Sequence, residues 1–336
     1  MSVGHGEREA GERYVVSTRM SGIGDRLICL AGAWIYARAT RRTLIADWRF
    51  GYLAEDRNSN AFALCFKNRG TLGGVPFIGD DSLTQLQLPN PRYPTIWNIK
   101  PSNRWTRSRP HRLLDADRHA AVELIRANRD RPEPVVIFDG CINDALVDFE
   151  DAHEFFQALE PVDSVGEAVA EFRRNAFGDR AVIGLHVRHG NGGDTMGHAR
   201  FWGSFEDAIA RCRRCVAAAR EQLGQDAAVF LCTDSIEVQS TVEGAVPGVI
   251  TRSKQFRARG EGELHWHEHA WRNRHDALTE MFLLSHVQAL IRYPPGSFFS
   301  LYGAVMKPRT GGVPSSVYDF LSGFDASDPL SPALIF

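Results

Sequence analysis

Residues 181–193 read AVIGLHVRHGNGG, an apolar run that ends in cationic and small residues. The apolar part, 181–187, is rich in β-branched residues and predicts a buried strand. A helical pattern over 204–222 and a second apolar run over 228–232 follow it. Strands that alternate with helices are typical of α/β proteins with parallel sheets. This stretch therefore predicts the fold class of the second half of the chain.

The same alternation continues on both sides of this stretch. The first half opens with a strand over 14–17, a turn over 21–24, a helix over about 25–39 and a strand over 43–47, which together form one βαβ unit. Prolines make 52–109 irregular. The remaining predicted elements are a helix near 117–128, a strand over 134–139, a helical acidic stretch over 148–179, a short helix after Ser235, a strand over 248–251, a helix over 276–285 and a strand over 288–293.

The length of 336 residues predicts two domains, because single cores rarely grow beyond about 250–300 residues. We expect a flexible tail over 1–12, an N-terminal α/β domain over 13–165, a C-terminal α/β domain over 166–325 and a second tail over 326–336.

The bulk composition excludes several classes of partner. A formal net charge of -2 supplies no general attraction to nucleic acid or to an anionic membrane. No run approaches the ~20 apolar residues that cross a bilayer, and residues 1–13 contain no apolar signal core. Six cysteines are scattered mostly in apolar runs and read as small buried hydrophobes. We expect a cytoplasmic protein, because a reducing compartment fits this cysteine usage.

Four apolar runs of the second half are followed directly by polar, cationic or small residues. Ligands of open α/β sheets bind outside the carboxyl ends of the strands, where such residues meet. The four segments are 186–192, 232–235, 252–256 and 294–299. They predict one binding site at one edge of the sheet.

Arg188 is the first candidate in this site. A guanidinium group offers a rigid fork of donors that takes two phosphate oxygens at once. Gly190, Gly192 and Gly193 follow it and allow close approach of the backbone to a ligand. The alternative is an arginine that pairs with a surface carboxylate.

Ser297 and Asp234 are further candidates. Ser297 precedes a predicted helix start, where a serine cap and free N–H groups favour an anion. Asp234 can accept paired N–H groups, as guanine would offer, or ribose hydroxyls. For each residue the alternative is an ordinary N-cap. In the first half, Gly22 and Gly24 with Asp25 place backbone N–H groups between a strand and a helix, although the third glycine of a dinucleotide motif is missing.

Two clusters suggest metal or redox chemistry without the required spacing. His265, His267, Glu268 and His269 are dense in potential ligands, but they lack the i, i+4 spacing of a helical zinc site. Cys212 and Cys215 form a CxxC inside an arginine-rich helix, with no second Cys or His pair nearby. The chain also has no Asp-x-Asp after a strand, so we expect no metal at the phosphate site.

Several ordered motifs carry a resemblance to a known family. The segment HVRHGNG at 186–192 resembles the first motif of the α-1,6-fucosyltransferases, especially those of bacterial nodulation. Further matching segments, in order, are RYVVS at 13–17, GIGD at 22–25, RTLIADWR at 42–49, SNAF at 59–62, FLCTDS at 230–235 and IRYPP at 291–295. The resemblance covers roughly residues 13–309.

The resemblance implies a GT-B-like α/β fold, with two Rossmann-like domains facing a cleft. It implies an acceptor-side N-terminal domain and a nucleotide-sugar-binding C-terminal domain. The expected reaction is metal-independent transfer of L-fucose from GDP-fucose, with inversion, to a GlcNAc-containing oligosaccharide such as a chitooligosaccharide or Nod-factor-like acceptor in α-1,6 linkage. No cofactor is expected, and the expected partners are the donor and the acceptor.

The resemblance also assigns roles to residues of this chain. Arg188 matches the arginine that stabilises the departing diphosphate. Where the family has Glu-Asp, this chain has Gly193 and Asp194, which leaves Asp194 as the expected base. Trp97 and Trp105 are expected to contact the acceptor, in a region that matches poorly. The expected nucleotide-sugar contacts are Gly22, Gly24, Asp25, His186, His189, Gly190, Asn191, Asp234, Ser235, Lys254, Phe256, Ser297, Phe298 and Phe299.

Two alternatives to this function remain open. The same fold can take another GDP- or UDP-sugar as donor. A nucleotide- or glycan-binding protein without catalysis is the other, because Gly193 stands where the family has an acidic residue. Hydrolysis assays on several sugar nucleotides, and GDP binding without transfer, separate these possibilities.

Overall fold

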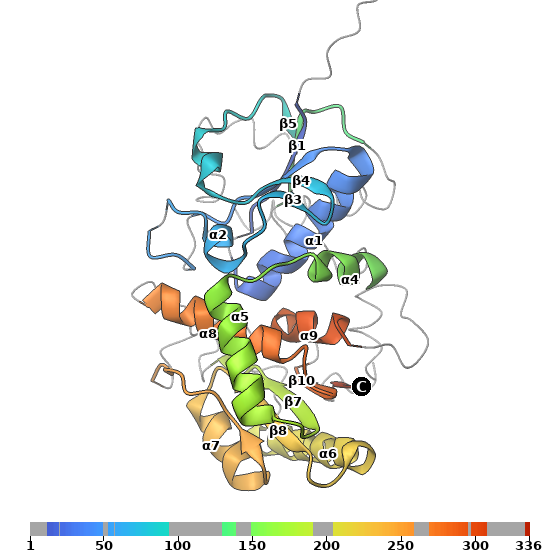
Figure 1. Cartoon of the computed structure of the whole chain (residues 1–336), viewed down its shortest axis with the longest axis vertical. Helices are drawn as coiled ribbons and strands as arrows, with labels where there is room; N and C mark the ends of the chain where they lie inside the picture. The colour runs from blue at the N-terminus through green and yellow to red at the C-terminus, as the bar shows by residue number, and fades with distance from the viewer. Residues whose placement is uncertain are drawn as a thin grey trace, which may run out of the picture.

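The computed structural model describes residues 12–19, 21–49, 53–56, 58–93, 130–138, 149–190, 204–258, 269–294, 297–307 and 333–336. Two α/β lobes lie one above the other, with a layer of helices between their sheets (Figure 1). The upper lobe in this view is N-terminal and the lower lobe is C-terminal.

The N-terminal lobe contains a sheet with the order β3-β4-β2-β1-β6-β5. β1 lies in the middle and pairs in parallel with β2 and β6. The elements are β1 (Tyr14–Ser17), α1 (Ile23–Thr40), β2 (Thr43–Ala46), α2 (Ala61–Cys65), β3 (Gly70–Leu72), β4 (Val75–Ile78), η1 (Asp81–Gln85), β5 (Arg92–Tyr93) and β6 (Val135–Phe138). The predicted βαβ unit at the start of the chain is confirmed.

The expectation of an irregular segment over 52–109 is wrong for its described part. β3 and β4 form an antiparallel hairpin around Gly73 and Gly74, which have φ values of +52° and +77°. A Gly-Gly pair at a two-residue turn is a hairpin signal, because both positions need positive φ. β3 and β4 are short and partly exposed, so the Gly-Gly turn was the available sequence signal for this hairpin, and the expectation for 52–109 did not use it.

The C-terminal lobe contains a sheet with the order β11-β10-β7-β8-β9. β10, β7, β8 and β9 are all parallel, which confirms the four predicted strands. The elements that follow β6 in the chain are α4 (Phe149–Gln157), which lies against α1, and α5 (Asp163–Phe172), η4 (Arg173–Phe177), β7 (Val182–Val187), α6 (Phe205–Leu223), β8 (Ala228–Thr233), α7 (Ile236–Ala245), β9 (Val249–Ile250), α8 (Ala270–Leu283), β10 (Ala289–Tyr293), η8 (Phe298–Ser300), α9 (Leu301–Val305) and β11 (Ala333–Ile335).

The expected C-terminal tail is wrong in part, and the expected boundary between the domains remains a prediction. Residues 333–335 are not part of a tail, because β11 pairs antiparallel with β10 and closes that edge of the sheet. The proposed domain boundary between 165 and 166 lies inside α5, whose neighbour α8 belongs to the C-terminal lobe. The expected N-terminal tail lies outside the described residues up to position 11, and the helix near 117–128 lies outside them entirely.

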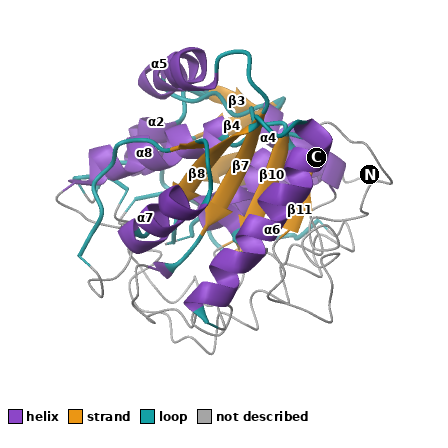
Figure 2. Cartoon of the chain, turned by 90° about the horizontal axis from the view of Figure 1, so that it is seen from below, coloured by secondary structure: helices purple, strands orange, loops and turns teal. Residues whose placement is uncertain are grey.

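Side chains of β7 alternate between two covered faces of the lower sheet. Ile183, Leu185 and Val187 face the core formed with α6 and α7. Gly184 faces Val287 and Leu284, on the side of α8 and α9. Figure 2 shows α6 and α7 on the face of the sheet that is seen from below. His186 therefore points to the helical layer between the lobes, because it lies on the same face as Gly184.

The helical layer joins the two lobes into one hydrophobic core. Phe156 of α4 packs edge-on against Tyr302 of α9, at 5.5 Å between ring centroids. Tyr302 also packs against Phe282 of α8, at 4.7 Å. One cluster of buried residues runs from β1 and α1 through these rings to β8. The relative position of the lobes is thus set by packed aromatic side chains.

Gly24 marks the closest approach of the two lobes. A Cβ atom on Gly24 would lie 2.6 Å from the carbonyl carbon and 2.7 Å from the carbonyl oxygen of Phe298, and 2.8 Å from the amide nitrogen of Phe299. These neighbours are backbone atoms, which cannot move aside as a flexible side chain can. The first turn of α1 and the start of η8 are therefore in direct backbone contact.

We predict that Gly24→Ala destabilises the protein by about 1–3 kcal/mol, because the added methyl group overpacks two backbones. Gly166→Ala in α5 is the matched control, since a Cβ there meets nothing within 4 Å and alanine favours a helix. Chemical denaturation of both variants measures the effect. A Gly24→Ala protein as stable as Gly166→Ala would contradict the close approach.

Candidate active site

Arg188 and Asp234 form an ion pair between two neighbouring loops at the carboxyl edge of the lower sheet. The Nη1 atom of Arg188 lies 2.8 Å from Oδ2 of Asp234. Arg188 follows β7 directly, and Asp234 follows β8 directly. The backbone N–H of Arg188 also donates to the carbonyl of Tyr293, at 2.7 Å. The ends of three adjacent strands therefore fix this arginine, as the strand order predicts.

Asp234 holds the loop after β7 as well as the arginine. Its Oδ1 accepts the backbone N–H of His189 at 2.8 Å, and its Oδ2 accepts that of Gly190 at 2.9 Å. Gly190 has a φ of +73°, a conformation that favours glycine. A buried carboxylate with this set of donors is well satisfied.

This geometry corrects one of the two interpretations of Asp234. The residue is not the N-cap of α7, because the Oγ of Ser235 accepts from the N–H of Val238 at 3.4 Å. Protein donors contact both of its oxygens, but a carboxylate has about four acceptor positions, and the expected contact with guanine or ribose remains a prediction. Asp234 positions Arg188, His189 and Gly190.

His186 lies next to this loop and is buried in the layer between the lobes. Its Nδ1 lies 2.9 Å from the Oγ of Ser300, and its ring packs on Phe299 at 5.1 Å. The pKa of His186 is well below its usual value, chiefly because burial disfavours the imidazolium, and then because Arg292, Arg188 and Lys254 lie nearby. The ring is therefore neutral at physiological pH.

Lys254 does not offer an unpaired ammonium group. Its Nζ lies 2.7 Å and 2.9 Å from the two carboxylate oxygens of Glu280 on α8, and both side chains are buried. The Nζ also lies 5.3 Å from the centre of the Phe256 ring. The ammonium group of Lys254, which was expected to contact phosphate, is therefore already paired with a carboxylate. The sequence did not reveal this pair because Glu280 is 26 residues away.

Ser297 precedes a helical turn as expected, but it does not cap it. Its side chain makes no capping hydrogen bond to η8, and its carbonyl accepts from Nη2 of Arg292. The next two residues contribute the backbone that touches Gly24 and the ring that packs on His186. The segment after β10 therefore connects His186 with the N-terminal lobe.

The turn before α1 faces the same region from the N-terminal lobe. Gly22 is the N-cap of α1 and provides no side chain. The Oγ of Ser21 donates to Asp25 at 2.6 Å, and Nε of Arg26 donates to the carbonyl of Ser21 at 2.9 Å. The structure brings Gly24 against the backbone of η8, with Gly22 and Asp25 next to it at the start of α1.

Sequence reasoning did not identify Arg292 and Ser300 as site residues. Arg292 lies fully buried within β10, and its Nε donates to the Oγ of Ser300 at 2.9 Å. The available signal was an arginine inside an otherwise apolar strand, ALIRY at 289–293. A buried charge on a strand needs partners, so such a residue is itself a site candidate.

Several predicted residues lie outside the part of the chain that the structure describes. Their expected roles remain predictions. They are Asn191, Asp194, Trp97 and Trp105, together with His265, His267 and Glu268 of the histidine cluster. Within the described ranges, no group of three His, Cys, Asp or Glu side chains forms a potential metal site. No helix in those ranges is long and apolar enough to cross a membrane.

The described cysteines are free thiols, as their sequence context predicts. Burial raises the pKa of Cys65 and of Cys212 to about 12, and it also raises the pKa of Cys215. A thiol must ionise to act as a nucleophile or a metal ligand. The CxxC on α6 is therefore poorly suited to either role.

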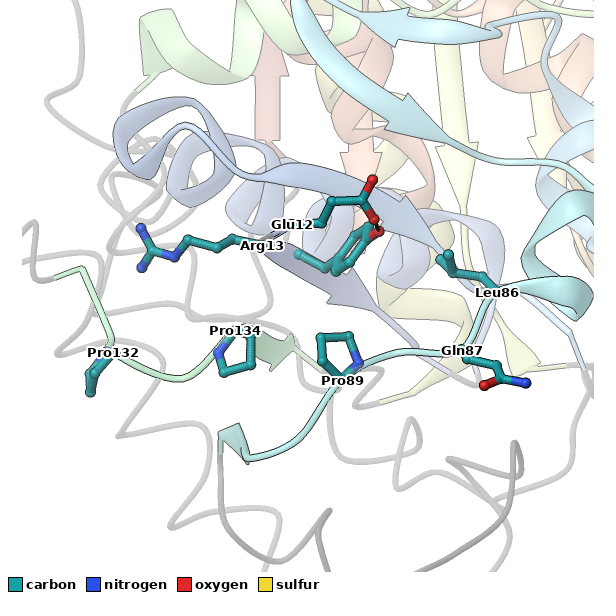
Figure 3. A pocket seen from close by; sticks show the side chains of 8 residues that line it. Glu12, Arg13, Leu86, Gln87, Pro89, Pro132 and Pro134 are labelled. Carbon is teal, nitrogen blue, oxygen red and sulfur yellow. Dashed lines mark hydrogen bonds between the residues drawn. The ribbon is translucent and has the colours of Figure 1, made fainter. Parts of the chain in front are cut away.

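A pocket of about 500 Å³ opens in the N-terminal lobe, at the edge of its sheet where β1 and β6 begin (Figure 3). Tyr14 begins β1 and Pro134 directly precedes β6, so this pocket lies at the amino ends of parallel strands. Its lining also includes Glu12, Arg13 and Pro89. Because the carboxyl ends bind ligands in such sheets, we do not place the active site there.

Comparisons with known proteins identify the family to which this chain is similar. The family described as Nodulation protein Z (NodZ) matches residues 11–314. Nodulation protein Z of Bradyrhizobium diazoefficiens is 36% identical over 301 residues, which cover 89% of this chain and 80% of that protein. The Sinorhizobium fredii protein is 35% identical, covering 88% of this chain and 92% of that protein.

Solved structures agree with this match. NodZ α-1,6-fucosyltransferase co-crystallised with GDP superposes with a TM-score of 0.75 at 31% identity, covering 88% of this chain and 93% of that one. A structure of NodZ α-1,6-fucosyltransferase soaked with GDP-fucose gives a TM-score of 0.78 at 30% identity, covering 96% of this chain and 99% of that one. An Arabidopsis thaliana FUT1 variant with GDP shares the fold at 16% identity, with a TM-score of 0.53, covering 92% of this chain and 74% of that one.

Two facing α/β lobes with these structural neighbours define a GT-B-like fold of the fucosyltransferase class. The chain belongs to the Nodulation protein Z (NodZ) family. The fold and the family that the sequence motifs predict are both confirmed.

We predict that Asp234→Asn lowers the free energy of unfolding by about 1–3 kcal/mol. The amide has one acceptor oxygen, and its NH2 group cannot accept the hydrogen bonds that the second carboxylate oxygen accepts. The loop of Arg188 should loosen as a result. Asp163→Asn is the control, because Asp163 is exposed and forms an ion pair with the exposed Lys67. Equal melting temperatures for the two variants would contradict the role of Asp234.

We also predict a pH effect from His186. The unfolded histidine takes up a proton near pH 6.5, whereas the folded one resists it, so stability is full above that pH and falls below it. Over the first pH unit below 6.5 the loss approaches about 1.4 kcal/mol for one proton. Urea unfolding of the wild type and of His186→Gln between pH 7.5 and 5.5 measures the difference. Parallel pH profiles would contradict a neutral buried His186.

Proposed function

We propose that this protein is a glycosyltransferase that transfers L-fucose from GDP-fucose to a GlcNAc-containing oligosaccharide. The observation that carries the proposal is Arg188, fixed at the carboxyl edge of the C-terminal sheet by Asp234 and Tyr293. Membership of the NodZ family supports the choice of donor, since relatives have been crystallised with GDP and GDP-fucose.

In the proposed reaction, an acceptor hydroxyl attacks the anomeric carbon of fucose. The new bond joins that carbon to the acceptor oxygen, and the bond to the β-phosphate oxygen of GDP breaks. Arg188 stabilises the charge that develops on the departing diphosphate. Electrostatic stabilisation of this kind is often the largest catalytic contribution, and each donor is worth roughly 10²–10³ in rate.

The acceptor hydroxyl must lose its proton as the bond forms. We assign this proton to the carboxylate of Asp194, in a direct displacement that inverts the anomeric carbon. We further assign acceptor stacking to Trp97 and Trp105, and an α-1,6 linkage to the product. The acceptor we favour is a chitooligosaccharide or Nod-factor-like glycan.

We propose that the transfer needs no metal ion. Three cationic side chains, Arg188, Arg292 and Lys254, lie near His186, and Arg188 is the one that we expect to contact the diphosphate. Guanidinium groups can neutralise a diphosphate by bidentate hydrogen bonds. We also place the enzyme in the cytoplasm, because its buried free thiols suit a reducing compartment.

We predict that Arg188→Ala lowers the rate of fucose transfer at least 10²-fold, with Arg188→Lys recovering only part of it, because an ammonium group lacks the planar fork. Arg213→Ala on the exposed face of α6 is the control for loss of one arginine. Transfer to chitooligosaccharides from GDP-fucose, and from other sugar nucleotides, provides the assay.

The same variants test donor binding by calorimetric titration with GDP, with and without EDTA. We expect binding that EDTA leaves unchanged and that Arg188→Ala weakens strongly. Absence of GDP binding by the wild type would contradict the proposed donor, and EDTA-sensitive binding would contradict metal independence. Tight GDP binding without transfer to any acceptor would favour a binding protein over an enzyme.

A further inference from the structure

His186 and Arg292 are direct neighbours in the lower sheet. β7 and β10 run in parallel, and their register places Arg292 opposite His186. Both side chains are buried, and both reach the Oγ of Ser300, which is itself fully buried at the end of η8. The distances from this Oγ to Nε of Arg292 and to Nδ1 of His186 are each 2.9 Å.

The direction of these hydrogen bonds follows from the chemistry of the three groups. A guanidinium can only donate, so Ser300 Oγ accepts from Arg292. The hydroxyl has one proton of its own, and among the described residues the atom positioned to accept it is Nδ1 of His186. Nδ1 therefore carries no proton.

A neutral imidazole with an unprotonated Nδ1 must carry its proton on Nε2. The neutral form is favoured here because the ring is buried beside three cations. Phe299 fixes the plane of the ring by packing on it at 5.1 Å. Ser300 is the hydrogen-bond partner that the described part of the chain provides for the ring, so the Nε2–H group remains for a ligand.

We propose that Arg292 and Ser300 are positioning residues that hold His186 as a neutral Nε2–H donor to the diphosphate of the sugar nucleotide. This inference rests on the proposed function, because it takes the diphosphate as the ligand beside Arg188. His186 lies two residues before Arg188 on the same strand end. One donor would be charged and one neutral, and both would be fixed by partners on adjacent strands.

The arrangement has a functional advantage over a charged histidine. A neutral donor keeps its proton across the physiological pH range, so phosphate binding at this atom does not vary with pH. It also avoids adding another positive charge beside Arg188, Arg292 and Lys254. The chain of hydrogen bonds from Arg292 through Ser300 to His186 therefore provides one more donor to the diphosphate and leaves the local charge unchanged.

The first test measures the tautomer directly in the unliganded protein. The ¹³Cδ2 and ¹⁵N chemical shifts of histidine-labelled protein distinguish the Nε2–H form from the Nδ1–H form and from imidazolium, and His186→Gln assigns the signal. We expect the Nε2–H form in the wild type and a mixture of tautomers in Ser300→Ala. An Nδ1–H or imidazolium signal in the wild type would overturn the proposal, whatever the donor proves to be.

The second test compares two amide replacements of His186. A glutamine amide reaches about as far as Nε2, whereas an asparagine amide reaches about as far as Nδ1. We expect His186→Gln to keep GDP affinity and transfer within about 10-fold of the wild type, and His186→Asn to lose roughly 10- to 100-fold, as for a hydrogen bond to a charged group. Equal losses in the two variants would contradict donation from Nε2.

Ser300→Ala completes the test, with Ser285→Ala as its control at the far end of the sheet, where the Ser285 hydroxyl donates to the carbonyl of Phe282. We expect several-fold weaker GDP binding in Ser300→Ala only. Unchanged GDP binding by Ser300→Ala would overturn the positioning role. A wild type that shows the Nε2–H tautomer yet does not bind GDP would instead contradict the proposed function and its diphosphate ligand.

Discussion

The ion pair between Arg188 and Asp234 organises the candidate active site. Only 7% of the Asp234 side chain and 20% of the Arg188 side chain are exposed, so both charges depend on each other and on nearby hydrogen bonds. Removal of one partner from a buried pair leaves an uncompensated charge, which costs about 3–5 kcal/mol. Asp234 also accepts two backbone N–H groups, and these hydrogen bonds offset the free-energy cost of burying its carboxylate. Residues 188–190, directly after β7, are thereby held in place by contacts within the protein.

The two lobes are joined next to this site by a shared hydrophobic core. Aromatic rings of α4, α8 and α9 pack together between the two sheets. Arg274 of α8, which is buried, donates to the carbonyl of Leu53 in the N-terminal lobe. With Gly24 in contact with the backbone of η8, small changes in lobe position act directly on the segment that carries Phe299 and Ser300.

Much of the fold could be predicted from the sequence because apolar runs and helical spacing report burial. β7, β8 and β10 were predicted within one or two residues, and their register then brought the predicted loops together. β11 and the β3–β4 hairpin were missed: β11 has only three residues, and β3 and β4 are partly exposed and lack the continuous apolar run of β1 and β2. The start of α8 was placed six residues late, since its first turns are polar and tertiary contacts stabilise them.

The position of the candidate site could be predicted from the sequence, but the contacts between its side chains could not. Arg188 followed from its place after an apolar run, whereas the role of Asp234 depends on which donors reach it in space. Lys254 was expected to meet phosphate, but its partner Glu280 lies on a helix that comes next to it only in the folded chain. Arg292 was read as part of an apolar strand, and its position beside His186 depends on the register between β10 and β7. Such pairings arise from topology, which local sequence patterns do not specify.

A crystal structure of the protein with GDP tests the central claim most directly. We predict density for the diphosphate at the carboxyl ends of β7 and β10, within hydrogen-bonding distance of Arg188, with the Arg188–Asp234 pair retained. A nucleotide bound elsewhere, for example in the pocket beside Tyr14, would contradict the account. So would a diphosphate beside β7 that makes no contact with Arg188.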